Sequence, residues 1–187
     1  MRREEFWQII DKTRKKYPVG SDDQFFLLER LLCKMAPREI LDFENIKNAL
    51  MAEGSSFALH VATFILFSEL SDELYEDMRA WLILSGEEVF TRITADPDSL
   101  VDLPINDPQA EIGGEGLLFA AEQAYVEVTN RDDFYKKLDP VREPFFKDPW
   151  PSTVQEYEAL LPRVYGQWFN EQAIIANQDE DPEEEDE

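Results

Sequence analysis

The chain has 187 residues, with 41 Asp and Glu against 18 Lys and Arg, so its formal net charge is −23. That length indicates one domain with at most a short appendage, and a hydrophobic content of 43% is enough for a sizeable core. The last nine residues hold eight of the acidic groups; the remaining 33 acidic residues still face 18 basic ones, a balance of about −15. Direct binding to a nucleic-acid backbone or an anionic membrane needs a basic surface, so this charge argues against both.

Residues 1–7 are not expected to be a signal peptide, because they contain neither an apolar core nor a small-residue cleavage site. The longest apolar stretch, residues 57–67, has 11 residues, whereas a membrane-spanning helix needs about 20. The single cysteine, Cys33, excludes an internal disulfide and a multi-cysteine metal site, and it fits a reducing compartment. We therefore expect a soluble, cytoplasmic protein that does not bind membranes.

Hydrophobic spacing predicts a series of helices in the first 130 residues. Ser21 and Ser71 are each followed by two acidic residues, as is typical of a helix N-cap and first turn. Pro37 suits the first turn of a helix, and Gly86 interrupts one. In chain order, helices are expected over residues 3–17, 22–32, 37–50, 57–67, 72–85, 89–93 and 117–128.

Two segments of this region are less regular. Residues 101–116 are rich in Pro and Gly and read as a loop. Residues 126–129 contain Val and Thr, which also favour a short strand, but the alanine-rich run before them favours a helix.

The fold class that follows is all-α, a compact bundle of about six to eight helices around the 57–67 helix. That helix is apolar nearly all round, so we expect it to be the most buried and central one. The side chains expected to be mostly buried are Phe6, Ile10, Leu28, Leu31, Ile46, Leu66, Trp81, Leu82 and Phe90.

Composition changes after Asn130. Four prolines fall within residues 140–151, which indicates an extended arm, and the aromatic residues among them indicate that the arm lies along the body. Thr153 and Glu156 form a capping-box pattern that opens a short helix, and one more docked helix is expected around residues 165–169. The expected organisation is a helical domain over 1–130, a packed extension over 131–177 and a disordered acidic tail over 178–187.

Part of the sequence resembles a known family. The stretches that carry the resemblance are residues 5–10 (EFWQII), 71–90 (SDELYEDMRAWLILSGEEVF) and 96–100 (DPDSL). They resemble a bacterial family known only as a domain of unknown function, DUF4240, over about residues 1–130. The most specific part is an Arg-x-Trp-Leu-Ile-x-x-Gly pattern, here residues 79–86. The resemblance implies a soluble, mostly helical bacterial domain, and it implies no activity.

The ligand-binding candidates are Arg79, Asp72 and Trp81, all within the 71–90 stretch. Arg79 stands between an acidic helix face and apolar residues, and arginine rarely enters a core unpaired. One interpretation is a structural ion pair with Asp72, Asp77 or an acid from another helix. The alternative interpretation is that Arg79 lies in a cleft and binds an anion.

Carboxylates one turn apart, Asp72/Glu76 and Glu73/Asp77, could hold a divalent cation or share a proton. With only one histidine in the chain the further ligands are missing, so a solvated helix face is favoured and no metal site is predicted.

Other candidates for chemistry are weaker. His60 lies in the apolar 57–67 helix, where a hydrogen-bonded structural histidine is favoured over a catalytic one. Cys33 is interpreted as a small core residue, and a Cys33–His60 dyad is the minor alternative. The run 113–116 (GGEG) lacks the Lys and Ser/Thr of a phosphate loop, so a flexible turn is favoured. No catalytic residue and no cofactor are predicted.

Two functions remain open at this point. The first is a non-enzymatic interaction protein for a basic protein partner, of which an immunity or antitoxin-like role is one concrete version. The alternative is a small-ligand protein or an unrecognised enzyme with a helical pocket near Arg79. The sequence does not indicate an oligomeric state.

Overall fold

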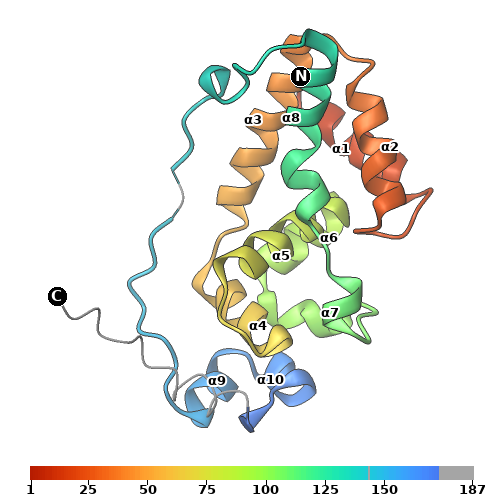
Figure 1. The fold of residues 1–187 in the computed structure, drawn as a ribbon. Coiled ribbons are helices and arrows are strands. Elements are labelled where there is room, and N and C mark those ends of the chain that lie inside the picture. The colour runs from red at the N-terminus through yellow and green to blue at the C-terminus, as the bar shows by residue number, and fades with distance from the viewer. Residues whose placement is uncertain (143, 173–187) are drawn as a thin grey trace, which may run out of the picture.

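The computed structural model describes residues 1–142 and 144–172, and every regular element in them is helical (Figure 1). The α-helices are α1 (Arg3–Arg14), α2 (Asp22–Leu32), α3 (Pro37–Glu53), α4 (Phe57–Phe67), α5 (Asp72–Leu84), α6 (Glu87–Ala95), α7 (Pro108–Glu111), α8 (Glu115–Thr129), α9 (Val154–Leu160) and α10 (Pro162–Trp168). Two short 3-10 helices, η1 (Pro97–Asp102) and η2 (Tyr135–Lys137), complete the described chain. The all-α prediction is confirmed.

The starts of α2, α3 and α5 lie where the local signals placed them. The side chains of Ser21 and Ser71 each accept a hydrogen bond from the backbone N–H three residues on, and α3 begins at Pro37. Helix α8 continues to Thr129, so residues 126–129 form no strand. The described residues contain ten α-helices where about six to eight were expected, and one of them, α7, lies inside the predicted loop. The two short helices expected after residue 152 are present as α9 and α10.

Most of the buried side chains lie where the hydrophobic pattern of their helix predicts them. On α4, eight of the 11 residues are buried, as its apolar composition predicts. Leu31 and Ile46 are only partly buried, which corrects the expectation for these two. They lie beside the buried stripes of their helices, which on α2 follow Gln24, Leu28 and Leu32 at intervals of four.

The bundle has a second centre, α8, that the sequence did not indicate. Helix α8 packs against α2, α3 and α5, whereas α4 contacts α5, η1, α7 and α10 toward the lower end of the molecule in Figure 1. The glycines at the start of α8 explain this close packing. A Cβ on Gly114 would lie 2.2 Å from the carbonyl oxygen of Asp77, and one on Gly116 would lie 2.8 Å from the Phe25 ring. Residues 113–116 are therefore a packing contact, and the prediction of a flexible turn is wrong.

The arm that follows α8 runs beside the bundle toward α9 and α10 (Figure 1). The side chain of Asn45 exchanges two hydrogen bonds with Asp139, at 2.9 and 3.1 Å. Further along, the rings of Phe146 and Trp150 lie 6.4 and 6.0 Å from the ring of Phe57. These contacts hold the arm against α3 and α4. The expected tail over 178–187 lies outside the described residues.

Within the described residues, no single helix has both the length and the apolar composition of a membrane span; α3 and α4 meet that test only as a pair, bent by 87° between them.

Candidate functional site

Arg79 is a buried arginine that joins two helices. Its side chain is 2% exposed, and its Nη1 donates to the carbonyl oxygen of Met51 at 3.1 Å. Its Nε donates to the carbonyl oxygen of Tyr75 at 3.4 Å, and the guanidinium carbon lies 4.4 Å from the centre of the Tyr75 ring. These contacts tie α5 to the carboxyl end of α3. Neither Asp72 nor Asp77 is in any ion pair of the described chain, so the interpretation that Arg79 pairs with one of these two acids is wrong, and pairing with an acid from another segment stays a prediction.

A cavity of about 540 Å³ lies beside Arg79. Asp72, one of the other candidates, lines the same cavity, because residues seven apart share one face of a helix. The remaining wall comes from the turn before α4, from α4 itself, from the first half of α5 and from the arm. Its residues are Ser55, His60, Tyr75, Glu76, Pro144, Phe145 and Phe146.

His60 is the titratable group of this cavity that the sequence analysis discounted. Its ring stacks on the Tyr75 ring, with 4.3 Å between centres and 15° between planes. Burial lowers the pKa of His60, an effect that the nearby Asp72 opposes, so the imidazole is neutral at pH 7. No described residue forms a hydrogen bond to its buried Nε2, which corrects the prediction of a hydrogen-bonded histidine.

Trp81 lies elsewhere, because a separation of two residues turns a helical side chain by about 200° from Arg79. It lines a second cavity of about 560 Å³, which also contains Arg14, Gly20 and Ser85. The structure therefore brings Arg79 and Asp72 together and leaves Trp81 on the far side of α5. A helical wheel of this helix predicts that Asp72 and Arg79 share one face and that Trp81 lies on another.

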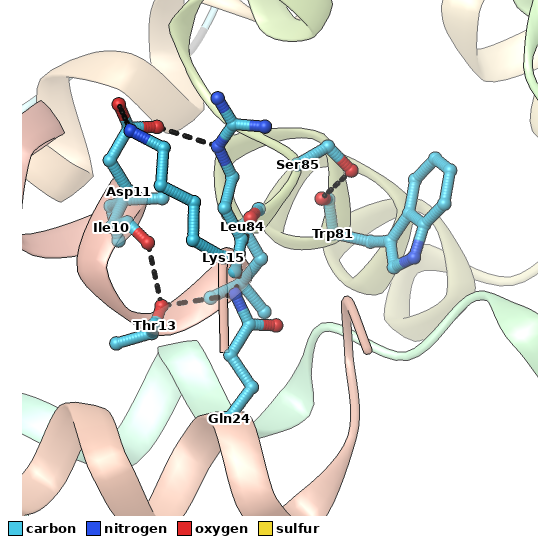
Figure 2. A network of polar contacts seen from close by, with 9 residues as sticks. Ile10, Asp11, Thr13, Lys15, Gln24, Trp81, Leu84 and Ser85 are labelled. Carbon is cyan, nitrogen blue, oxygen red and sulfur yellow. Dashed lines mark hydrogen bonds and ion pairs between the residues drawn. The ribbon is translucent and has the colours of Figure 1, made fainter. Parts of the chain in front are cut away.

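A buried polar network lies next to Trp81 and was missed by the sequence analysis (Figure 2). The side-chain amide of Gln24, which is fully buried, donates to Thr13 Oγ1 at 3.1 Å and to the carbonyl oxygen of Leu84 at 3.2 Å. Thr13 in turn donates to the carbonyl oxygen of Ile10 at 2.7 Å. The network fixes the ends of α1 and α5 and the start of α2 relative to one another, because each buried polar group has a partner.

Carboxylates gather on the outer faces of α5 and α8. They are Glu73, Glu76, Asp77 and Glu115, and we call them the carboxylate cluster. Burial raises the pKa of Asp77, and the charges of Glu115, Glu76 and Glu73 raise it further. In the described part of the chain, no group of His, Cys, Asp and Glu side chains is arranged to hold a metal ion.

Cys33 ends α2 and is partly buried. Burial raises the pKa of its thiol, and Glu29 and Glu127 raise it further. A cysteine nucleophile requires the opposite shift, since the thiolate is the reactive form.

Comparison with known proteins gives one finding. Neither the curated proteins nor the solved structures contain a significant match. A family model does match residues 1–127, which include α1 to α6 and most of α8 together with all three ligand-binding candidates. The chain therefore belongs to the family described as protein of unknown function (DUF4240).

Proposed function

We propose that this protein is a non-enzymatic interaction module that binds a basic protein partner. The observation that carries the proposal is the carboxylate cluster. No ion pair among the described residues includes any of its four members, and their repulsion contributes to the raised pKa of Asp77. A cationic partner would relieve this repulsion, and complementary charge would speed its encounter and disfavour wrong partners.

An apolar patch next to the cluster supports the same proposal. Phe119 is 42% exposed and lies one helical turn after Glu115 on α8. Together with Leu118, Leu138 and Glu76 it lines a groove of about 620 Å³. A partner segment with both basic and apolar side chains would cover the groove and the cluster together.

One concrete version of this function is an immunity or antitoxin-like protein. Nuclease toxins carry cationic surfaces that bind nucleic acid, so their blockers are acidic. In this version the protein acts in the cytoplasm, a compartment that the lone thiol of Cys33 suits.

The experiment is capture from a native lysate on the immobilised full-length chain, with two matched triple variants. The first, Glu73→Lys/Glu76→Lys/Glu115→Lys, reverses three charges of the cluster. The second, the control, makes the same charge change on exposed acids elsewhere: Glu127→Lys/Asp132→Lys/Glu158→Lys.

We expect the native chain and the control to retain a basic protein at low salt and to release it at about 0.5 M salt, where the Debye length falls to a few ångströms. The cluster variant should not retain it. The proposal fails if no basic protein is retained, or if the two triple variants behave alike.

The alternative, a small-ligand protein or enzyme, is favoured by the buried Nε2 of His60 in the Arg79 cavity. Arg79→Ala is a poor test, because it would remove the side-chain donor of the buried Met51 carbonyl and the link between α5 and α3. His60→Phe keeps the stack on Tyr75 and removes the ring nitrogens. A thermal-shift screen of metals, nucleotides and metabolites would support this alternative if a stabilising compound lost its effect in His60→Phe.

A further inference from the structure

We infer that the cavity beside Trp81 binds a small molecule with an apolar body and a carboxylate group. The cavity lies between the carboxyl end of α1, the turn that carries Gly20 and the segment before α8. Its volume of about 560 Å³ is in the range of ordinary small-molecule sites. Its apolar wall is formed by Pro18, Val19, Trp81, Val89, Leu103, Pro104 and Ile105.

The other polar side chains around the cavity are already satisfied. The hydroxyl groups of Ser21 and Ser85 each donate to a backbone carbonyl, at 2.7 and 2.8 Å. The carboxylate of Glu111 accepts from two backbone N–H groups, at 3.1 and 3.0 Å, which partly compensates its charge. None of these three side chains therefore requires a ligand.

Two donors of the cavity remain without an acceptor in the described chain. The indole of Trp81 is 7% exposed, its Nε1 is fully buried, and no described residue accepts from it. Figure 2 shows that this indole projects away from the Thr13–Gln24 network. The Nε of Arg14 donates to Asp11 at 2.6 Å, whereas its Nη1 and Nη2 form no hydrogen bond with the described residues. A site with free donors selects a ligand that carries acceptors.

Two glycines hold the backbone close to these donors, both at positive φ. Gly86 has φ of 99°, and a Cβ there would lie 2.6 Å from Arg14 Nε. Gly20 has φ of 77°, and a Cβ there would lie 2.5 Å from the carbonyl oxygen of Gly113 and 3.1 Å from Trp81 Cδ1. No hydrogen bond in the described chain joins Gly20 to Gly113. Gly20 therefore brings its backbone against Gly113 and beside the indole ring of Trp81, where a larger residue would not fit.

The lining holds one cation, Arg14, and one anion, Glu111, whose charge two backbone N–H groups partly compensate, so the lining favours a negative group on the ligand. Four of the 18 basic residues lie in residues 12–16, so the carboxyl end of α1 is positive in an otherwise acidic protein. The guanidinium group of Arg14 presents two parallel N–H donors that match the two oxygens of a carboxylate. The apolar wall then receives the remainder of the ligand.

The test uses phenylacetate as the probe and phenylacetamide as its neutral counterpart of the same shape. Binding is followed on the full chain by the NMR signals of the four indole N–H groups, and Trp81→Phe identifies the signal of Trp81. Phenylacetate should shift that signal in a saturable manner, and phenylacetamide should bind at least about tenfold more weakly because it lacks the charge.

Matched variants test whether phenylacetate binds in this cavity or elsewhere on the surface. Arg14→Gln should weaken phenylacetate binding about tenfold or more. The control Arg3→Gln removes an arginine that pairs with Glu53 outside this cavity, and Trp150→Phe removes an indole that already donates to Tyr157. Neither control should change the affinity.

The inference is overturned if phenylacetate leaves the Trp81 signal unmoved up to about 20 mM, beyond the weakest affinity of interest. It is also overturned if the amide binds equally well, or if folded Arg14→Gln binds like the native chain. The comparison of phenylacetate with its amide does not use Arg14→Gln, so it decides the matter even where that substitution unfolds the protein. The carboxylate cluster lies outside the lining of this cavity, so failure here leaves the proposal of a basic partner standing.

Discussion

Arg163 donates its backbone N–H to both carboxylate oxygens of Asp98, at 2.9 and 3.1 Å, although 65 positions separate the two residues. Val164 donates its N–H to the same carboxylate at 2.9 Å. Leu161, which precedes α10, has no side chain able to cap the helix. Asp98 in η1 therefore caps the first turn of α10 from a distant part of the chain, and it fastens the carboxyl-terminal helices to the region that the family model matches.

The first prediction concerns this cap. Asp98→Ala should lower the free energy of unfolding by about 0.5–2 kcal/mol, the usual cost of losing an N-cap. Chemical denaturation measures the loss, and limited proteolysis should cut the arm over residues 131–152 faster than in the native chain. Asp132→Ala, at an exposed position, is the control. Equal stability and equal cutting rates for the two variants would contradict the capping role.

The second prediction tests the glycines at the start of α8. Gly114→Ala should destabilise the fold by about 1–3 kcal/mol, because the added methyl group overpacks the contact with α5. Gly166 provides the matched control, since nothing lies within 4 Å of a Cβ built there. Gly166→Ala should instead stabilise α10 by about 0.5–1 kcal/mol through its higher helix propensity. Thermal melting of both variants checks these two expectations. A Gly114→Ala variant as stable as the native chain would favour the original interpretation of residues 113–116 as a flexible turn.

The third prediction is a pH dependence from Asp77. Burial and the charges of Glu115, Glu76 and Glu73 raise its pKa above the ordinary value of 3.8. A raised carboxyl pKa means that the folded state binds the proton more tightly than the unfolded state. Its contribution to stability is therefore complete below pH 3.8 and is lost as the pH rises through the folded pKa.

Asp77→Asn should accordingly melt at a higher temperature than the native chain at pH 7, and this advantage should shrink toward pH 4. The control Asp132→Asn should show no such trend. An Asp77→Asn variant that is less stable than the native chain at pH 7 would show that this carboxylate has a stabilising partner.

The fourth prediction concerns salt. The region before residue 179 carries about −15, so at least 15 of its 33 carboxylates lack a cation of their own. Added salt shortens the Debye length to about 8–10 Å near physiological strength and weakens their repulsion. The melting temperature should therefore rise from low to moderate salt, and the rise should persist, somewhat reduced, after deletion of residues 179–187. A rise that vanished with the deletion would mean that the charges of the folded body are compensated.

The sequence could predict the helices because their signals are local. Ser21, Ser71 and Pro37 act within one turn of chain, and the apolar composition of residues 57–67 requires burial whatever the neighbours are. The same local reasoning failed at residues 113–116. Glycine permits both flexibility and close approach, and only the position of α5 decides between them.

The candidate site was predictable only in part. The seven-residue spacing of Asp72 and Arg79 already places them on one face of a helix, and it places Trp81 on another. The partners of these side chains come from distant segments, however. Met51 on α3 accepts from Arg79, and Arg14 on α1 shares a cavity with Trp81.

The sequence by itself determined the all-α class, the family, the net charge and the starts of α2, α3 and α5, because each depends on composition or on residues within a few positions of one another. Only the tertiary structure decided that Asp98 caps α10, that α8 shares the centre of the bundle and that the candidates line two separate cavities. These features depend on how helices pack across long separations in the chain. Such packing is set by the complementary shapes of whole surfaces, which no local pattern encodes.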